Sequence, residues 1–198
     1  MRDHTFRILF AALWVAFFAV RIHYQRKMPK GRTYTRVRAA REICLFKAFA
    51  LGYLAVALYA VTPWLDAGSV ALGAAVRWAG AAIALLGIAY FGWAHAALGA
   101  NWTAVPALSP EHQLVTSGPY RRVRHPMYSA FIAIGIGLSL VAANWIVAVL
   151  YLGTMLPMYF LRVAGEEQMM LDRFGDEYRR YMAATGRLFP RLQGPPAQ

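Results

Sequence analysis

Two short stretches of the sequence combine residue types that can bind a charged ligand. The first contains Arg124-His125-Pro126-Met127-Tyr128, which follows two further arginines. The second contains Arg162 and the pair Glu166-Glu167. Arg162 and Glu166 are four residues apart, so in a helix they share one face. Carboxylate, guanidinium, imidazole and phenol groups in these two stretches could hold a polar ligand through charge and hydrogen bonds.

Each stretch also has a purely structural explanation. Pro126 is expected to open a helix, where its missing N–H costs nothing. The arginines could then anchor to lipid headgroups, Tyr128 could belong to an aromatic belt, and His125 could satisfy the first helical turn. Arg162 and Glu166 could be a surface pair worth about 0.3–0.5 kcal/mol. The second stretch directly follows an apolar run, however, and ionisable residues beside membrane helices usually serve a site.

The elements that must position these residues are apolar and long. Of the 198 residues, 59% are hydrophobic and 15% charged, against roughly 25% charged in an ordinary soluble domain. A helix needs about 20 apolar residues to cross a bilayer. We therefore expect an all-α integral membrane protein with about five transmembrane helices, over residues 6–24, 43–61, 70–98, 127–142 and 145–161. The first run ends in Arg21 and His23 rather than at a small-residue cleavage site, which favours a span over a removable signal peptide.

The charge distribution gives an orientation. The formal net charge is +12, and five spans would place all Lys and Arg residues on one side except Arg2, Arg7 and Arg77. Positive loops face the cytoplasm, which predicts an outside N-terminus, a cytoplasmic C-terminus and a site at the cytoplasmic face. A basic face also suits anionic lipid headgroups, and we favour membrane lipids over nucleic acid as its partner.

The sequence also predicts how the spans pack and end. Gly73, Gly80, Gly87 and Ala94 recur every seven residues, a spacing that lets a neighbouring helix approach closely. Residues 142–144 are too few for anything but a tight turn, so the last two runs should form a helical hairpin. Pro157 should kink the second of these helices. After Leu161 the pattern becomes amphipathic, as in a helix that lies at the membrane interface.

Cys44 is the only cysteine, which excludes a disulfide framework and a cysteine-based zinc site; we predict no bound metal. We divide the chain into residues 1–98, with three transmembrane helices and a basic cytoplasmic loop, and residues 99–198, with a cofactor-binding loop, a transmembrane hairpin and a C-terminal catalytic helix.

The two stretches together resemble the isoprenylcysteine carboxyl methyltransferase family of membrane enzymes. The matching pattern is Arg-His-Pro-x-Tyr at residues 124–128, followed after a helical hairpin by Glu166-Glu167. Residues 112–120 also match as His-x-Leu-Val-x-x-Gly-x-Tyr, and residues 174–178 as Phe-Gly-x-Glu-Tyr. The resemblance covers about residues 100–190. A glutamine that the family carries upstream of residue 112 has no counterpart here.

The resemblance implies an S-adenosylmethionine-dependent methyltransferase with its pocket at the cytoplasmic face. Glu166 would hold the charged end of S-adenosylmethionine, and Arg162 would face the substrate; these two are the predicted catalytic residues. The predicted cofactor-binding residues are His112, Gln113, Leu114, Val115, Tyr120, His125, Pro126, Met127, Tyr128 and Glu166.

The chemistry of these side chains agrees with such roles. A sulfonium and an ammonium suit a carboxylate and the aromatic faces of Tyr120 and Tyr128. The cofactor carboxylate could use N–H groups at the start of the fourth helix. Arg162 could position a substrate carboxylate through two hydrogen bonds. A carboxylate nucleophile would require no general base.

The acceptor is predicted only as a lipophilic molecule, such as the carboxylate of an isoprenylcysteine-like substrate or a related small lipid. One alternative is an NADPH-dependent membrane reductase of the sterol reductase type. Another is a basic membrane scaffold in which the motifs only anchor helices. The sequence leaves the oligomeric state open.

Overall fold

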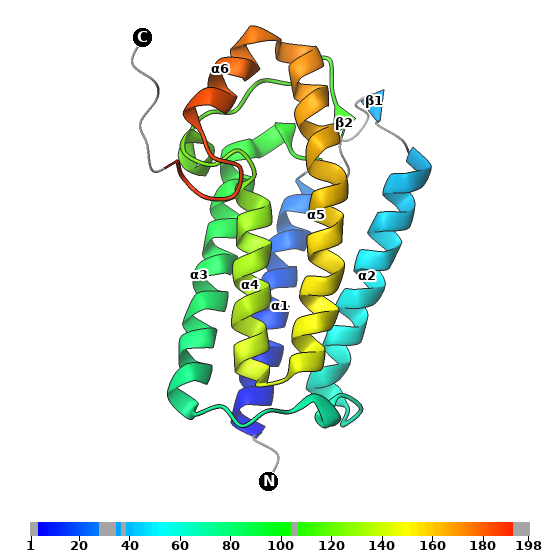
Figure 1. The fold of residues 1–198 in the computed structure, drawn as a ribbon, viewed down its shortest axis with the longest axis vertical. Coiled ribbons are helices and arrows are strands. Elements are labelled where there is room, and N and C mark those ends of the chain that lie inside the picture. Colours follow the sequence, from blue (N-terminus) through cyan, green and yellow to red (C-terminus); the bar gives the residue numbers. More distant parts are fainter. Residues whose placement is uncertain (1–3, 28–34, 37–38, 104–106, 192–198) are drawn as a thin grey trace.

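The fold consists of five long helices that run side by side (Figure 1). Residues 62–73 and a tight turn at residues 143–144 join helices at one end, and the motif at residues 124–128 lies at the other end. The computed structural model describes residues 4–27, 35–36, 39–103 and 107–191. The long helices are α1 (His4–Arg26), α2 (Ala39–Val61), α3 (Ala74–Leu98), α4 (Pro126–Ala142) and α5 (Trp145–Phe174). The smaller elements are β1 (Thr35–Arg36), η1 (Asp66–Gly68), η2 (Gly99–Asn101), β2 (Ala107–Leu108), η3 (Gly118–Arg121) and α6 (Asp176–Ala184).

The predicted all-α membrane architecture is confirmed. Within the described residues, three helices are long and apolar enough to cross a membrane: α1, α5, and α3 extended by η2. α4 and the apolar part of α2, Lys47–Val61, are shorter. The 17 residues of α4 rise roughly 26 Å, slightly less than the hydrocarbon thickness of a bilayer. The number of spans therefore stays a prediction.

Small residues let α3 and α4 approach closely, as the sequence predicts. A Cβ added at Gly80 would lie 2.9 Å from the carbonyl oxygen of Gly137, and one at Gly87 would lie 3.1 Å from the backbone nitrogen of Ile134. Ala94 is fully buried. Gly73 differs, because it precedes α3 and nothing lies near its added Cβ. The core between the helices is strongly aromatic, with Phe10, Phe17, Phe91 and Tyr151 fully buried.

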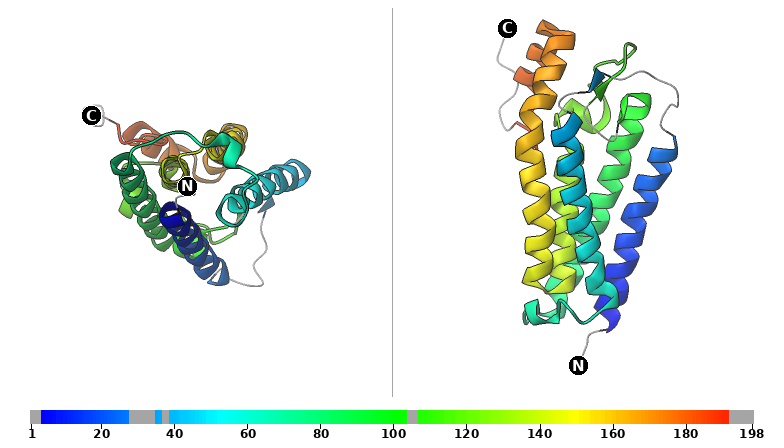
Figure 2. Two further views of the ribbon diagram at one scale, coloured as in Figure 1. Left: turned by 90° about the horizontal axis from the view of Figure 1, so that it is seen from below. Right: turned by 90° about the vertical axis from the view of Figure 1, so that its right-hand side faces the viewer.

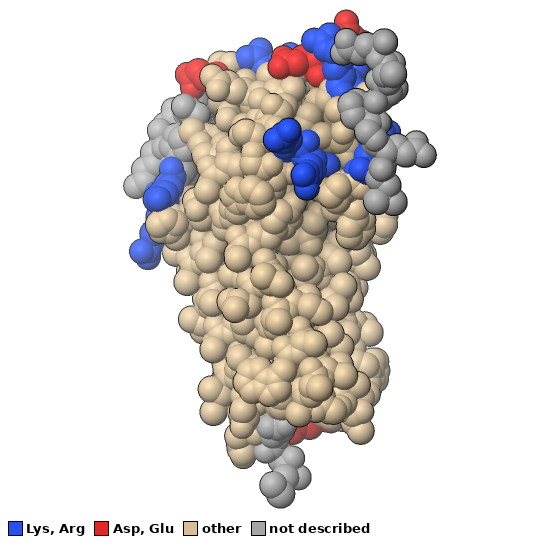
Figure 3. Space-filling model, turned by 90° about the vertical axis from the view of Figure 1, so that its left-hand side faces the viewer, with Lys and Arg blue, Asp and Glu red and all other residues tan. Residues whose placement is uncertain are grey.

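At the end of the bundle near the N-terminus, two arginines donate hydrogen bonds to backbone carbonyl groups. Arg7 donates to the carbonyl oxygen of Thr62 at 2.9 Å and pairs with Asp66. Arg77 donates through Nε and Nη2 to the carbonyl oxygen of Val141, at 3.0 and 2.8 Å. The predicted tight turn follows directly, since Ala143 adopts a left-handed conformation (φ 48°) and Asn144 caps α5. Figure 3 shows a broad uncharged surface between this end and the opposite one, where Lys and Arg gather.

The segment after Leu161 is helical, as the sequence predicts, but it divides between the end of α5 and the short helix α6. α5 continues without a break through Pro157 and Leu161 to Phe174, where Gly175 ends it with a φ of 53°. The 30 residues of α5 rise about 45 Å, more than a bilayer core requires. Its last turns therefore extend past the other helices, and α6 folds back beside them (Figures 1 and 2). The amphipathic pattern belongs to the end of α5 and to α6, which together hold the site.

Candidate functional site

The start of α4 is held in place by the C-terminal segment of the chain. His125 is the N-cap residue of α4, and Pro126 is the first helical residue, as predicted. The N–H of Arg124 donates to the carbonyl oxygen of Gly186 at 2.8 Å, and that of His125 to Arg187 at 3.0 Å. Ser129, one turn into α4, donates its hydroxyl to the carbonyl oxygen of Leu188 at 2.6 Å. These bonds tie both ends of the motif to a segment about 60 residues later.

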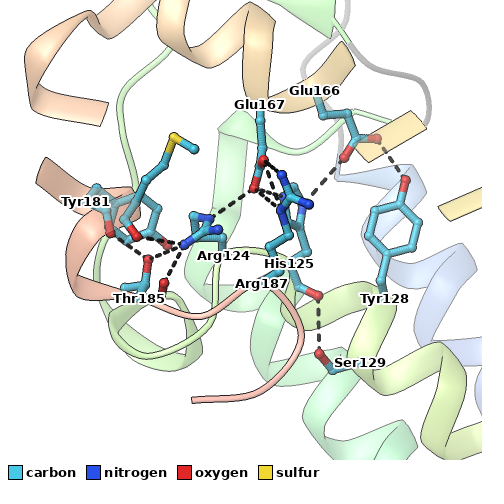
Figure 4. Close-up of polar contacts among 10 residues, drawn as sticks. Arg124, His125, Tyr128, Ser129, Glu166, Glu167, Tyr181, Thr185 and Arg187 are labelled. Atoms are coloured by element: carbon cyan, nitrogen blue, oxygen red, sulfur yellow. Dashed lines mark hydrogen bonds and ion pairs between the residues drawn. The ribbon is translucent and has the colours of Figure 1, made fainter. Parts of the chain in front are cut away.

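The Glu167 carboxylate is the centre of a buried ionic network (Figure 4). Its side chain is 5% exposed. It accepts hydrogen bonds from Arg124 Nε at 3.0 Å and from Arg187 Nη2 at 2.6 Å. Arg124 also donates to the carbonyl oxygens of Met182 and Thr185, at the end of α6. Glu167 thereby joins the motif before α4, the end of α5 and the C-terminal segment.

The Glu166 carboxylate has other partners and is more accessible, at 19% exposed. Tyr128 donates its hydroxyl to Glu166 Oε1 at 2.8 Å, and Figure 4 shows these two side chains pointing toward each other. The other oxygen lies 3.6 Å from His125 Nδ1, and Arg162 Nε lies 3.6 Å from Oε1. One face of α5 and the first turn of α4 thus hold this carboxylate in a fixed position.

A cavity opens beside Glu166, and every predicted catalytic and cofactor-binding residue lines it. The predicted residues come from three parts of the chain: the loop before η3 with η3 itself, the start of α4, and α5. They are His112, Gln113, Leu114, Val115, Tyr120, His125, Pro126, Met127, Tyr128, Arg162 and Glu166. The loop is anchored because the Gln113 N–H donates to Asn101 Oδ1 at 3.0 Å. Among the described residues, no group of three or more His, Cys, Asp or Glu is arranged to hold a metal ion.

The cavity has further lining residues that the sequence prediction missed. Met169 and Met170 of α5 and Tyr178 and Tyr181 of α6 lie around the same end as the loop. Deeper in the bundle, the lining continues with Arg21, Phe49, Phe131 and Met158. The amphipathic pattern after Leu161 was the only signal for the first group. In the second group, Arg21 and Phe49 come from α1 and α2, which carry no motif, and Phe131 and Met158 lie on α4 and α5 outside the motifs.

The start of α4 offers fewer donors for an anion than the sequence suggests. The N–H of His125 already donates to the carbonyl oxygen of Arg187, and the N–H of Tyr128 donates to the carbonyl oxygen of His125. Pro126 has no N–H to offer. The proposed role of this helix start in binding a cofactor carboxylate is therefore weakened.

Burial shifts the pKa of two lining residues outside the bundle. Desolvation, helped by the nearby positive charge of Arg173, lowers the pKa of His112. Desolvation, together with the nearby Tyr181 hydroxyl and the Glu166 carboxylate, raises the pKa of Tyr120. At neutral pH, His112 is therefore uncharged and Tyr120 keeps its proton. Neither residue adds charge to the cavity at that pH.

Residues 80–172 match the Isoprenylcysteine carboxyl methyltransferase (ICMT) family. The chain is 32% identical over 71 residues to the protein-S-isoprenylcysteine O-methyltransferase of Schizosaccharomyces pombe, covering 36% of this chain and 30% of that protein. It is 34% identical over 86 residues to the Mus musculus protein of the same name, covering 43% and 30%. The chain thus spans about a third of the length of these curated relatives. The resemblance seen in the sequence is confirmed, although the family match begins in α3 and ends before residues 174–178.

The fold is also similar to a solved structure, that of the eukaryotic intramembrane Ras methyltransferase ICMT. The TM-score is 0.53 at 23% sequence identity, and the match covers 77% of this chain and 51% of the other. At this identity the likeness concerns the fold alone. It extends the similarity beyond the family match, to most of the helical bundle.

Proposed function

Because residues 80–172 match the isoprenylcysteine carboxyl methyltransferase family, we propose that the protein is a membrane methyltransferase that uses S-adenosylmethionine and acts on a lipophilic acceptor. The supporting observation is that all eleven residues to which the resemblance assigns a role line one cavity. They lie on three separate segments between residues 112 and 166, so a pattern without functional meaning gives no reason for them to converge.

The residues around the cavity fit S-adenosylmethionine. Its sulfonium and ammonium groups need a carboxylate, and Glu166 presents one that is fixed by Tyr128 but still accessible. Tyr120 and Tyr128 provide aromatic faces for a cation. Leu114, Val115 and the methionines of α5 provide apolar surface for a purine ring. The fit rests on this combination of one carboxylate, aromatic rings and apolar walls.

When bound, S-adenosylmethionine would supply an electrophilic methyl group, with a neutral thioether as the leaving group. The protein's own task is to align the acceptor with the methyl donor and to exclude water. No covalent intermediate with a side chain is needed. Glu166 fixes the position of positive charge, and Tyr128 fixes one oxygen of Glu166. Tyr120 of η3 and Tyr181 of α6 both line the cavity, and the Tyr181 hydroxyl donates to the carbonyl oxygen of Tyr120 at 2.7 Å. Arg162 faces the acceptor.

The acceptor enters from the bilayer, in this proposal, and the site lies at the cytoplasmic face. Support for a lipophilic acceptor comes from Phe49, Phe131 and Met158, which extend the cavity lining into the bundle. Support for the orientation comes from Arg121, Arg122 and the other basic residues at the same end as the cavity. The candidate acceptors are isoprenylcysteine-like carboxylates and related small lipids.

The test is binding of S-adenosylmethionine to the detergent-purified protein. Wild type should bind saturably, and Glu166→Gln should lose most of the affinity, because it removes the negative charge with little change in shape. Asp172→Asn is the matched control, since Asp172 lies on the same helix, accepts a hydrogen bond from the exposed Gln168 and does not line the cavity. NADPH serves as a second ligand. Binding of NADPH but not of S-adenosylmethionine would reject the proposal in favour of a reductase, and a folded protein that binds neither would also reject it.

A further inference from the structure

A second groove lies on the exposed side of α3 and α4 and is separate from the cavity beside Glu166. Its lining comes from α3, from α4, from η3 with the two residues after it, and from residues 188–190 of the C-terminal segment. The groove has a volume of about 860 Å³, within the range of about 300–1,000 Å³ that small-molecule sites usually have. It shares no lining residue with the cavity. The proposed reaction therefore gives this groove no role.

One wall of the groove is an apolar face of α3. Four residues of this helix line the groove at intervals of three and four positions, so they share one side of the helix. They are Ile83, Leu86, Tyr90 and Trp93. Leu86 is 70% and Trp93 54% exposed, and the rings of Tyr90 and Trp93 lie 5.9 Å apart. Because Tyr and Trp gather where membrane helices leave the hydrocarbon, this wall passes from the bilayer core to the level of the headgroups.

Two consecutive arginines lie at the headgroup end of this wall. Arg121 and Arg122 line the groove, and both are exposed. No acidic residue lines the groove, and within the described part of the chain neither guanidinium has an ion-pair partner. Figure 3, which views the molecule from the side of α3, shows Lys and Arg side chains above a broad uncharged surface. The groove is thus positively charged at one end and apolar along α3.

The segment that carries the two arginines is fixed in place from both sides. Gly118 packs against α3, because an added Cβ there would lie 3.1 Å from the Cβ of Ala97 and 3.3 Å from Trp93 Nε1. On the other side, the N–H of Gly186 donates to the carbonyl oxygen of Arg122 at 3.2 Å. These contacts hold the backbone of both arginines beside the groove before a ligand arrives, which lowers the cost of binding.

We propose that this groove binds one anionic phospholipid from the leaflet at this end of the bundle, with its phosphate at Arg121 and Arg122 and an acyl chain along α3. Each guanidinium can form paired hydrogen bonds with phosphate oxygens. Basic pockets beside membrane helices bind anionic headgroups in this way. A free phosphate would use only the arginines and leave the apolar wall uncovered, so the wall favours a lipid. This proposal does not depend on the methyltransferase activity.

The experiment measures binding of dioleoyl phosphatidylglycerol to the purified full-length protein in a non-ionic detergent, by native mass spectrometry. Dioleoyl phosphatidylcholine has the same chains and no net charge, and inorganic phosphate has the charge without the chains. The test variant is Arg121→Gln with Arg122→Gln. The matched control is Arg179→Gln with Arg180→Gln, a second pair of consecutive exposed arginines, which lies on α6 outside the groove. The unfolding midpoint of each variant without lipid reports whether the fold is intact.

We expect one molecule of phosphatidylglycerol to bind wild type more tightly than phosphatidylcholine does, and its affinity to fall roughly tenfold or more in the test variant. The control should match wild type. Arg121→Lys with Arg122→Lys should retain most of the affinity, because it keeps both charges. Since the lipid binds only the folded chain, it should also raise the unfolding midpoint of wild type more than that of the test variant.

Three results would overturn the proposal: equal affinity of wild type for the two lipids, unchanged affinity in the test variant, or an equal loss in the test variant and the control. The last result would show that the lipid responds to the total charge of the protein and not to the groove. Displacement of phosphatidylglycerol by millimolar inorganic phosphate would overturn the assignment to a lipid, because the chains would then contribute nothing.

Discussion

Glu166 and Glu167 are consecutive residues of α5, but their carboxylates bind different partners. Glu166 accepts from the Tyr128 hydroxyl at 2.8 Å and lines the cavity. The Glu167 carboxylate does not line the cavity, and it accepts hydrogen bonds from Arg124 and Arg187. His125 lies between them, with Nδ1 3.6 Å from Glu166 and Nε2 3.4 Å from Glu167. The Glu-Glu pair therefore combines one carboxylate that faces the ligand cavity with one that holds the surrounding segments together.

Glu167→Gln should lower the stability of the protein more than any change at Glu166. It leaves the buried Arg124 without its carboxylate, and breaking a buried ion pair in this way costs on the order of 3 kcal/mol. The measurement is the unfolding midpoint in detergent, followed by tryptophan fluorescence. Glu166→Gln is the comparison, and it should unfold close to wild type while losing donor binding. Equal midpoints for the two variants would contradict the division of roles.

Tyr128→Phe should weaken binding of S-adenosylmethionine about tenfold, because it removes a charge-assisted hydrogen bond to Glu166. The change keeps the ring and so keeps most of the packing. Tyr159→Phe is a suitable control, since its ring lies 5.1 Å from that of Tyr128 but does not line the cavity. Donor affinity that survives in Tyr128→Phe and is lost in Glu166→Gln would show that the tyrosine does not position the carboxylate.

The sequence brought out the residues that line the cavity better than the residues that hold the surrounding segments together. His125, Tyr128 and Glu166 could be found because their types and spacing match a known pattern. The pairing of Glu167 with Arg187 depends on how α6 folds back, and no local spacing encodes it. Arg21 is a similar case, because it reaches the cavity only through the packing of α1 against the other helices. Contacts between segments far apart in sequence were therefore the ones missed.

The helices were predicted well where hydropathy alone determines them. The exception is the end of α5, where the sequence predicted that the apolar span ends at Leu161 and that an amphipathic helix at the membrane interface follows. The helix continues there because Arg, Glu, Gln and Met, which occur in this stretch, are good helix formers. The helix ends where a residue with positive φ is required, at Gly175. Hydropathy marks a membrane boundary and not the end of a helix.

Gly137→Ala should destabilise the packing of α3 against α4. The added Cβ would lie 2.5 Å from the backbone nitrogen of Ala84 and 2.6 Å from the carbonyl oxygen of Gly80, so the backbones would have to separate. We expect a loss of roughly 1–3 kcal/mol. Gly153→Ala in α5 is the control, because nothing lies within 4 Å of its added Cβ. That variant should be neutral or slightly stabilised through its higher helix propensity, and a similar loss in both would argue against the close approach.

The stability of the protein should fall as the pH is lowered below about 6.5, and His112 should account for part of this fall. Burial and Arg173 lower the pKa of His112 in the folded protein, so the unfolded chain takes up the proton first. Stability is then full above the unfolded pKa and decreases toward the lowered folded pKa. His112→Gln should show a shallower decrease when unfolding midpoints are compared between pH 7.5 and 5.5. An identical slope in the two proteins would contradict this role.

The five-span topology predicts that residue 67 lies outside the cell and residue 117 in the cytoplasm. Ala67 and Ser117 are both exposed, at opposite ends of the bundle. In a Cys44→Ser background, Ala67→Cys should react with a membrane-impermeant maleimide in intact cells, and Ser117→Cys only after permeabilisation. The physical reason is that α3, the helix between these two positions, is long and apolar enough to cross the bilayer, and the basic residues that follow it are retained inside. Labelling of Ser117→Cys in intact cells would place the cavity at the outer face, and labelling of both would require a different number of spans.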